Sequence, residues 1–241
     1  LRILLVEQFQ LGHARGASHG DSRIYRWTDS DPHVAGMAQA AWSHWKRLEE
    51  ELGKKPLLKT VASVDFGRAK GEAMKRIIGA AELNGIEHTL LTGEELCERF
   101  PAMRPFSDDQ AVVGCWEAHG SIVDAASTLA GLQQLFLASE GCAIAEHTRL
   151  VAVERGRAGG PLELKLAATA DATSASSSLS STRTVRCEKL VLAPGPYANA
   201  ALAALVSRSA LPAFKVWRMT YGYFRVDPPL APAFALGALP V

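Results

Sequence analysis

The sequence opens on the segment that most constrains its fold. Residues 1–9 form a nearly continuous apolar run without a helical stripe, and Glu7 stands near its end. Such a run is typical of a strand buried on both faces of a parallel sheet, because helices cover both faces of that kind of sheet. We therefore expect an α/β fold in which residues 1–9 supply one of the parallel strands.

Periodicity in the rest of the chain predicts alternating helices and strands. Apolar residues recur at helical spacing after Asp31, an expected N-cap, and Thr92 with Glu95 forms a capping box. The segments predicted to be helical are 31–52, 70–83, 92–100, 124–140 and 197–206. The segments predicted to be strands are 57–66, 111–117, 142–148, 150–154, 187–193 and 214–226. Residues 10–21 are expected to form a glycine-rich loop, and the Ser-rich residues 169–184 a disordered hairpin tip.

Charge and composition limit the classes of partner. The formal net charge is +1, so no overall field would attract nucleic acid or an anionic membrane. No apolar run reaches the ~18–20 residues of a membrane helix. The cysteines are Cys97, Cys115, Cys142 and Cys187. They form no CxxC pair and no zinc spacing with the histidines, so no metal site is expected. Free cysteines favour an intracellular compartment, and the sequence leaves open whether it is cytoplasmic or peroxisomal.

The strongest chemical signal lies in residues 16–26, which read GASHGDSRIYR. This loop places a histidine, an aspartate and two arginines shortly after the Glu7-Gln8-Phe9 end of the first strand. Residues 6–26 resemble the corresponding segment of the FAD-dependent amine oxidases of the D-amino-acid-oxidase superfamily, on the side of sarcosine oxidase, pipecolate oxidase and N-methyltryptophan oxidase. The later segments that resemble this family, in the same order along the chain, are 117–124, 143–153, 188–197 and 216–224.

The resemblance implies a FAD-binding Rossmann-like domain of the glutathione-reductase type and a mixed-sheet α+β substrate domain. It assigns residues 1–28 and 119–208 to the FAD-binding domain, with 169–184 as an insertion. Residues 29–118 and 209–241 fall to the substrate domain. Both domains are expected to be partial, because the family's glycine-rich strand-turn-helix precedes the first matching strand, and its FAD-linked cysteine and substrate lysine follow the last one. We therefore expect this stretch of chain alone to be inactive.

The resemblance also implies roles for site residues. The catalytic residues would be His19 and Arg23 beside the flavin, and Arg26 would bind the substrate carboxylate through its planar fork. The residues that the resemblance places against FAD are Glu7, Gln8, Ser18, His19, Arg23, Val151 and Gly195. Structural roles stay open, because Arg26 could instead form a surface salt bridge. Arg23 could pair with Asp21 or Asp29.

Position alone allows two interpretations of Glu7. An acid at the carboxyl end of a buried parallel strand is where dinucleotide-binding folds hold a ribose hydroxyl, but position by itself favours an acid that is only solvated at the strand end, and the cofactor role depends on the family resemblance. The histidines outside the loop are interpreted as structural, and they are His33, His44, His88, His119 and His147. Trp42 and Trp45 are expected to pack in the core, since they lie on one face of a predicted helix.

The activity that the resemblance implies is oxidation of the C–N bond of a secondary or N-methyl amino acid, of the sarcosine or pipecolate type, to an imine. The expected partners are the small-molecule amino-acid substrate and dioxygen, which would be reduced to hydrogen peroxide, and the protein is expected to be a monomer. Two alternatives stay open. One is an amine dehydrogenase of the same superfamily that uses another electron acceptor, and the other is an inactive fragment or binding domain.

Overall fold

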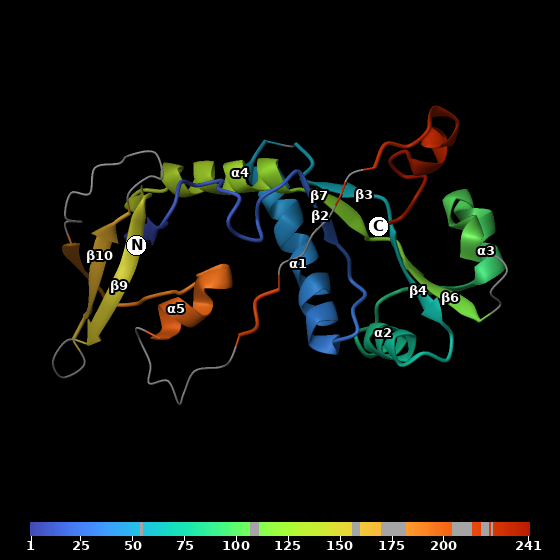
Figure 1. Cartoon of the computed structure of the whole chain (residues 1–241), viewed down its shortest axis with the longest axis horizontal. Coiled ribbons are helices and arrows are strands. Elements are labelled where there is room, and N and C mark those ends of the chain that lie inside the picture. The colour runs from blue at the N-terminus through green and yellow to red at the C-terminus, as the bar shows by residue number, and fades with distance from the viewer. Residues whose placement is uncertain are drawn as a thin grey trace. The chain divides into compact units, whose positions relative to one another are not determined.

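The computed structural model describes residues 1–53, 55–106, 111–155, 160–169, 182–203, 214–217, 222 and 224–241. Its contacts divide the chain into two compact units. Unit 1 contains residues 1–20 and 129–221, and unit 2 contains residues 21–128 and 222–241. Figure 1 shows the elements of both units in colours that follow the sequence. The assignment of a FAD-binding domain and a substrate domain to particular residues remains a prediction.

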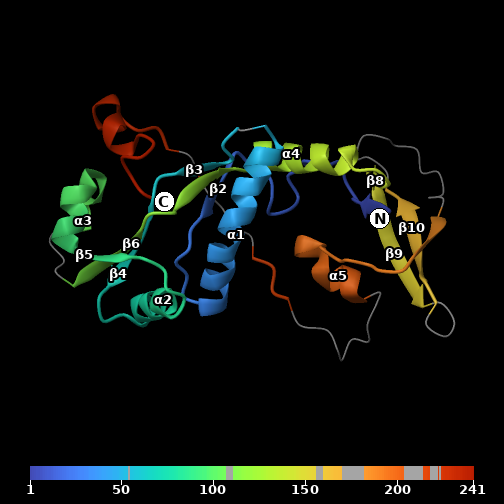
Figure 2. The ribbon, with the colours of Figure 1, turned by 180° about the vertical axis from the view of Figure 1, so that it is seen from behind.

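Unit 1 contains a parallel strand pair, and residues 3–6 supply one of its two strands as the sequence predicts. Its strands are β1 (Ile3–Val6), β8 (Cys142–Ala145), β9 (Thr148–Arg155), β10 (Leu162–Ala168) and β11 (Thr182–Cys187). Strand β1 runs parallel to β8, with Ile3 opposite Cys142. The other three strands form an antiparallel sheet in the order β11-β10-β9, and β9 and β10 are seen side by side in Figure 2. Parallel and antiparallel sheets together with helices confirm the α/β class.

Strand β1 differs from the sequence-based expectation in its burial. Ile3, Leu4 and Leu5 are 41%, 40% and 37% exposed, so burial on both faces is wrong for this strand. The physical reason is the size of the sheet, since no described strand other than β8 pairs with β1. A parallel pair without neighbouring strands cannot enclose its own apolar side chains.

Unit 2 is built from two antiparallel sheets. The first has the order β2-β7-β3 and consists of β2 (Ser22–Tyr25), β7 (Ser121–Asp124) and β3 (Leu58–Thr60). The second has the order β4-β6-β5 and consists of β4 (Ser63–Arg68), β6 (Val112–Glu117) and β5 (Thr89–Thr92). The strand predicted over 57–66 is therefore divided between the sheets. The division falls at Ala62, whose φ of +68° interrupts the extended backbone.

The helices agree well with the predictions. They are α1 (Pro32–Glu51), α2 (Glu72–Leu83), α3 (Gly93–Arg99), α4 (Ala125–Ala138) and α5 (Ala198–Ala203). The Asp31 side chain accepts a hydrogen bond from the amide of His33, as expected of an N-cap. The capping box of Thr92 and Glu95 is confirmed in both directions. Short 3-10 helices cover Pro101–Phe106, Gly195–Tyr197 and Pro228–Phe234.

The strand predicted over 187–193 is wrong. The chain is extended in β11, which ends at Cys187, and no strand is present over 188–193. Strand β11 forms because it can pair with β10, whereas residues 188–193 have no strand partner in the part of the chain that is described. The described residues within 214–226 also contain no strand. Of the disordered tip predicted over 169–184, residues 182–184 belong to β11 and Thr169 donates to Gln8 O, while residues 170–181 lie outside the described residues.

The core that is described lies mainly in unit 2. One cluster of buried residues consists of Ala35, Ala80, Ala81 and Ile86, with Trp27 packed against it. A second consists of Leu91, Leu96, Phe100 and Met103, with Trp116 among its partly buried neighbours. All four cysteines are free thiols, and burial raises the pKa of the fully buried Cys115 to about 11. Across the described ranges, no helix has the length and hydropathy of a membrane span.

Glu49 joins α1 to the start of β3. Its Oε1 accepts hydrogen bonds from the amides of Leu57 and Leu58, both at 2.8 Å, and its Oε2 accepts one from Lys46 Nζ at 3.0 Å. Burial alone would raise the pKa of this carboxyl. The hydrogen bonds and the charge of Lys46 outweigh burial, and together they hold the pKa below its usual value of 4.5.

We expect the stabilisation by Glu49 to depend on pH. Because its pKa is lower in the folded than in the unfolded protein, the contribution is present above the unfolded value and is lost as the pH falls through the folded one. Glu49→Gln should lower the free energy of unfolding by about 1 kcal/mol near neutral pH and by less at about pH 3. Urea unfolding at both pH values measures this, with Glu50→Gln, exposed on the same helix, as the control. An equal loss at both pH values would contradict the prediction.

Candidate functional site

Glu7 lies at the carboxyl end of β1, beside the end of its parallel partner β8. Its amide donates to Ala145 O at 2.9 Å, and its carboxylate Oε1 accepts from the amide of Phe9 at 2.9 Å. His13 Nε2 lies 3.5 Å from the same oxygen. Among the described residues, no hydrogen bond engages the other oxygen, Oε2. Glu7 therefore presents an acceptor at the position where dinucleotide-binding folds hold a ribose hydroxyl.

The backbone next to Glu7 is held by two segments of unit 1. Thr169 Oγ1 donates to Gln8 O at 2.7 Å. The ring of Phe9 contacts that of Tyr197, with centroids 5.7 Å apart, so the turn at Gly195 lies beside the end of β1. Gly195 has a φ of +54°, and a Cβ placed there would meet nothing within 4 Å. The turn therefore combines a glycine conformation with open space next to the predicted cofactor residues.

The loop over residues 10–20 carries two more of the predicted residues. His19 Nδ1 lies 2.5 Å from Gly16 O. A carbonyl only accepts, so Nδ1 must carry the proton, and in the neutral ring Nε2 is then the acceptor. Ser18 is exposed in the same loop. Val151 is half-buried in β9, also in unit 1.

Arg23 and Arg26 belong to unit 2. Arg23 lies on β2, is half-buried and donates from Nη1 to Ser22 O at 2.6 Å. Arg26 follows β2 with a side chain that is 42% exposed. Its Nε donates to Thr28 O at 3.0 Å, and the carboxylates of Asp29 and Asp65 come within 3.9 Å of its guanidinium. In unit 1 the structure thus brings Glu7, Gln8 and the turn at Gly195 together after the end of β1. In unit 2, Arg23 lies within β2 and Arg26 directly follows it.

A buried group in unit 2 is formed by residues that the sequence pattern does not bring together. We call it the Glu117 cluster, and it consists of Trp27, Ser63, Glu117 and His119. Glu117 is fully buried and accepts hydrogen bonds from the amide of Trp27, Ser63 Oγ and the amide of His119. The rings of Trp27 and His119 are stacked, with centroids 3.6 Å apart and planes 4° apart. The sequence pattern predicts a structural role for His119, and its signal for Glu117 is an acid at the end of the apolar run 111–117.

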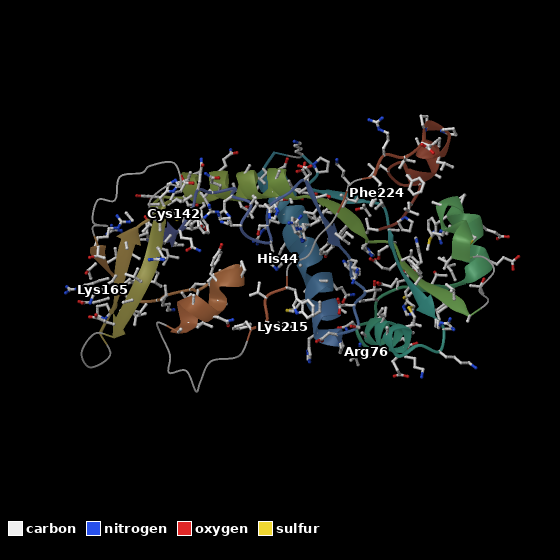
Figure 3. The ribbon with its side chains drawn as sticks, in the orientation of Figure 1. His44, Arg76, Cys142, Lys165, Lys215 and Phe224 are labelled. Atoms are coloured by element: carbon white, nitrogen blue, oxygen red, sulfur yellow. The ribbon has the colours of Figure 1, made fainter. Side chains whose placement is uncertain are left out.

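A cavity and two exposed side chains of unit 2 do not involve the predicted site residues or the Glu117 cluster. A cavity of about 680 Å³ in unit 2 is lined by Arg99, Phe100, Trp116 and Pro232 among others, and by none of the predicted site residues. Figure 3 shows His44 on α1 and Arg76 on α2, and both side chains are exposed. No group of His, Cys, Asp and Glu side chains suited to a metal ion is present among the residues described.

Comparison with known protein families identifies the family of this chain. The family described as FAD dependent oxidoreductase matches residues 1–239. The chain belongs to this family. A FAD-dependent oxidoreductase domain of this type uses FAD as its cofactor, in agreement with the predicted cofactor. The open oxygen of Glu7 and the open space at Gly195 are compatible with a bound dinucleotide.

Relatives within this FAD-dependent oxidoreductase family are named as sarcosine oxidases. The peroxisomal sarcosine oxidase of Homo sapiens is 29% identical over 198 residues, which are 82% of this chain and 45% of that protein. The monomeric sarcosine oxidase of Arthrobacter sp. (strain TE1826) is 34% identical over 106 residues, which are 43% of this chain and 27% of that protein. The chain therefore spans less than half the length of these relatives.

Solved structures confirm the fold of the family. The open form of NikD, described as an unusual amino acid oxidase, matches with a TM-score of 0.61 at 19% identity. The match covers 82% of this chain and 46% of the NikD chain. A modified fructosyl peptide oxidase from Aspergillus nidulans matches with a TM-score of 0.60 at 16% identity. The match covers 80% of this chain and 43% of the oxidase chain. At these identities the likeness shows the fold alone.

Proposed function

We propose that the chain is part of an oxidase that converts the C–N bond of a secondary or N-methyl amino acid to an imine. The proposed substrates are of the sarcosine or pipecolate type, with dioxygen as the electron acceptor and hydrogen peroxide as the product. The observation that carries the proposal is the fork of Arg26. Its Nε is held by Thr28 O, and its terminal nitrogens make no hydrogen bond with the residues that the structure describes. Such a fork suits an amino-acid carboxylate.

The proposed cofactor contacts lie mainly around the end of β1. Glu7 would accept a ribose hydroxyl through its open oxygen, and Gly195 would allow the backbone to approach FAD closely. Contacts with FAD are also proposed for Gln8, Ser18, His19, Arg23 and Val151. Bound FAD would supply the two-electron oxidation of the bond between the amine nitrogen and its carbon, with dioxygen as the final electron acceptor.

The chain's own residues would orient the substrate and balance the charges that the reaction involves. Arg26 holds the carboxylate, which fixes the position of the amine carbon. His19, which Gly16 O holds at Nδ1, would act on the proton of the substrate amine. The positive charge of Arg23 would stabilise the negative charge of the reduced flavin. Water then hydrolyses the released imine.

The setting of this enzyme is also a proposal. We propose a monomer that acts inside the cell, in the cytoplasm or in the peroxisome. Relatives from Homo sapiens and Mus musculus are named peroxisomal sarcosine oxidases, which makes the peroxisome a compartment to test by imaging a tagged full-length protein.

Arg26→Ala tests the proposed function. We expect kcat/KM for sarcosine or L-pipecolate to fall about 10- to 100-fold in the FAD-loaded full-length protein, because a charge-assisted hydrogen-bond pair is lost. Arg26→Lys should recover only part of this loss, since an ammonium group cannot bind a carboxylate with a planar fork. Hydrogen peroxide release measures the rate, and visible absorption measures bound FAD.

Arg76→Ala, an exposed arginine on α2, is the matched control and should leave the rate unchanged. An unchanged kcat/KM in Arg26→Ala would remove Arg26 from carboxylate binding. Turnover of an artificial electron acceptor without peroxide would indicate a dehydrogenase instead. Absence of bound FAD in the wild-type protein would favour a binding domain.

A further inference from the structure

Glu117 is a buried acid whose hydrogen-bond donors come from three segments of unit 2. Its side chain is 0% exposed. Oε1 accepts from the amide of Trp27 at 3.3 Å and from Ser63 Oγ at 2.8 Å, while Oε2 accepts from the amide of His119 at 2.6 Å. Burying a carboxylate is costly unless hydrogen bonds compensate for its lost hydration. A carboxylate offers an acceptor oxygen on each side, which a neutral amide cannot do.

Trp27, whose amide donates to Glu117, is also fixed through its ring. Trp27 stacks on His119 and packs edge-on against Trp42, with ring centroids 6.0 Å apart. Its Nε1 donates to the hydroxyl of Tyr25 at 3.1 Å. Trp27 therefore has little freedom to move in its backbone or its side chain.

Arg26 depends on this held backbone for its direction. Its Nε donates to Thr28 O, so the guanidinium is attached to the backbone just beyond Trp27. Thr28 is fully buried, and its Oγ1 donates to Asp65 at 2.7 Å. Arg26 is thus an exposed fork on a short segment that Glu117 holds at one residue and Asp65 at the next.

We propose that Glu117 is a positioning residue for substrate binding, whose buried carboxylate fixes the Trp27 backbone and thereby aims the Arg26 fork at the substrate carboxylate. This role rests on the proposed function, in which Arg26 binds that carboxylate. Ser63 and His119 assist by holding the carboxylate of Glu117 in place. Glu117 itself does not touch the substrate.

Glu117→Gln tests the role, because glutamine keeps the volume but removes the charge and has an acceptor oxygen on one side only. Depending on which way the amide turns, it leaves without an acceptor either the amide of His119 or both the amide of Trp27 and Ser63 Oγ, and in both cases the hold on the three segments is weakened. In the FAD-loaded full-length protein we expect KM for sarcosine to rise about tenfold with little change in kcat. The kcat/KM for sarcosine methyl ester, which lacks the carboxylate charge, should hardly change. Glu82→Gln, an exposed acid on α2, is the control.

A double variant separates positioning from general damage. Arg26→Ala together with Glu117→Gln should match Arg26→Ala alone to within about twofold, because both changes remove the same interaction. Additive losses, or an equal loss for sarcosine and its ester, would overturn the proposal. If Glu117→Gln does not fold, Ser63→Ala should show a smaller rise in KM with the same preference for the carboxylate substrate, and its absence would count against the role.

The two proposals fail in different ways. If Arg26→Ala raises KM for sarcosine and Glu117→Gln does not, only the positioning role is overturned. If Arg26→Ala itself leaves KM unchanged, the assignment of Arg26 fails and the positioning role fails with it.

Discussion

Gly120→Ala is expected to destabilise unit 2 by about 3 kcal/mol or more, because the added methyl group has no space. A Cβ at Gly120 would lie 2.3 Å from the backbone atoms Ala62 C and Ser63 N. Those atoms cannot move freely, since Val61 N donates to Gly120 O at 2.8 Å and Ser63 Oγ holds Glu117. Urea unfolding, followed by tryptophan fluorescence, measures the change in the free energy of unfolding.

Gly79→Ala is the matched control and should have the opposite sign. Gly79 lies inside α2, and a Cβ there would meet nothing within 4 Å. Alanine in an exposed helical position is favoured over glycine by about 0.5–1 kcal/mol, so this variant should be slightly more stable than the wild type. A Gly120→Ala protein as stable as Gly79→Ala would show that the β6–β7 turn can shift away from Ala62.

Leu96→Ala is expected to cost about 2–5 kcal/mol, the range for a large-to-small change in a packed core. Leu96 is 0% exposed and lies in the buried cluster with Leu91, Phe100 and Met103. Truncation removes apolar burial and leaves a cavity that this α3 region can fill only in part. Urea or thermal unfolding gives the magnitude.

The same truncation at an exposed leucine provides the comparison. Leu83 is 76% exposed at the end of α2, and Leu83→Ala should change the free energy of unfolding by less than about 0.5 kcal/mol. Similar losses for both variants would mean that the Leu96 cluster is not a close-packed core.

Structural features encoded within a few residues could be predicted from the sequence. The N-cap at Asp31 and the capping box at Thr92 depend on neighbours along the chain, and both are present. Strands depend on partners that are distant in sequence. The apolar run 187–193 satisfies the pattern of a buried strand, yet β10 pairs with the segment that ends at Cys187 instead.

The candidate site shows the same limit. The loop over residues 16–26 could be recognised because its chemical groups are adjacent in the sequence, and it led to the family. The Glu117 cluster could not be predicted in this way, because Glu117 meets Ser63 and Trp27 only through the pairing of β6 with β4 and the path of the chain after β2.

The pairing of β1 with β8 has a consequence for the order of folding. Ile3 is paired with Cys142, and residues 21–128 of unit 2 lie between these partners in the sequence. Closing so long a loop in an unfolded chain is entropically costly and slow, whereas a folded unit 2 shortens the distance to be searched. We therefore expect β1 to join the structure late. During synthesis it leaves the ribosome well before its partner, with apolar side chains that a chaperone could bind until β8 arrives.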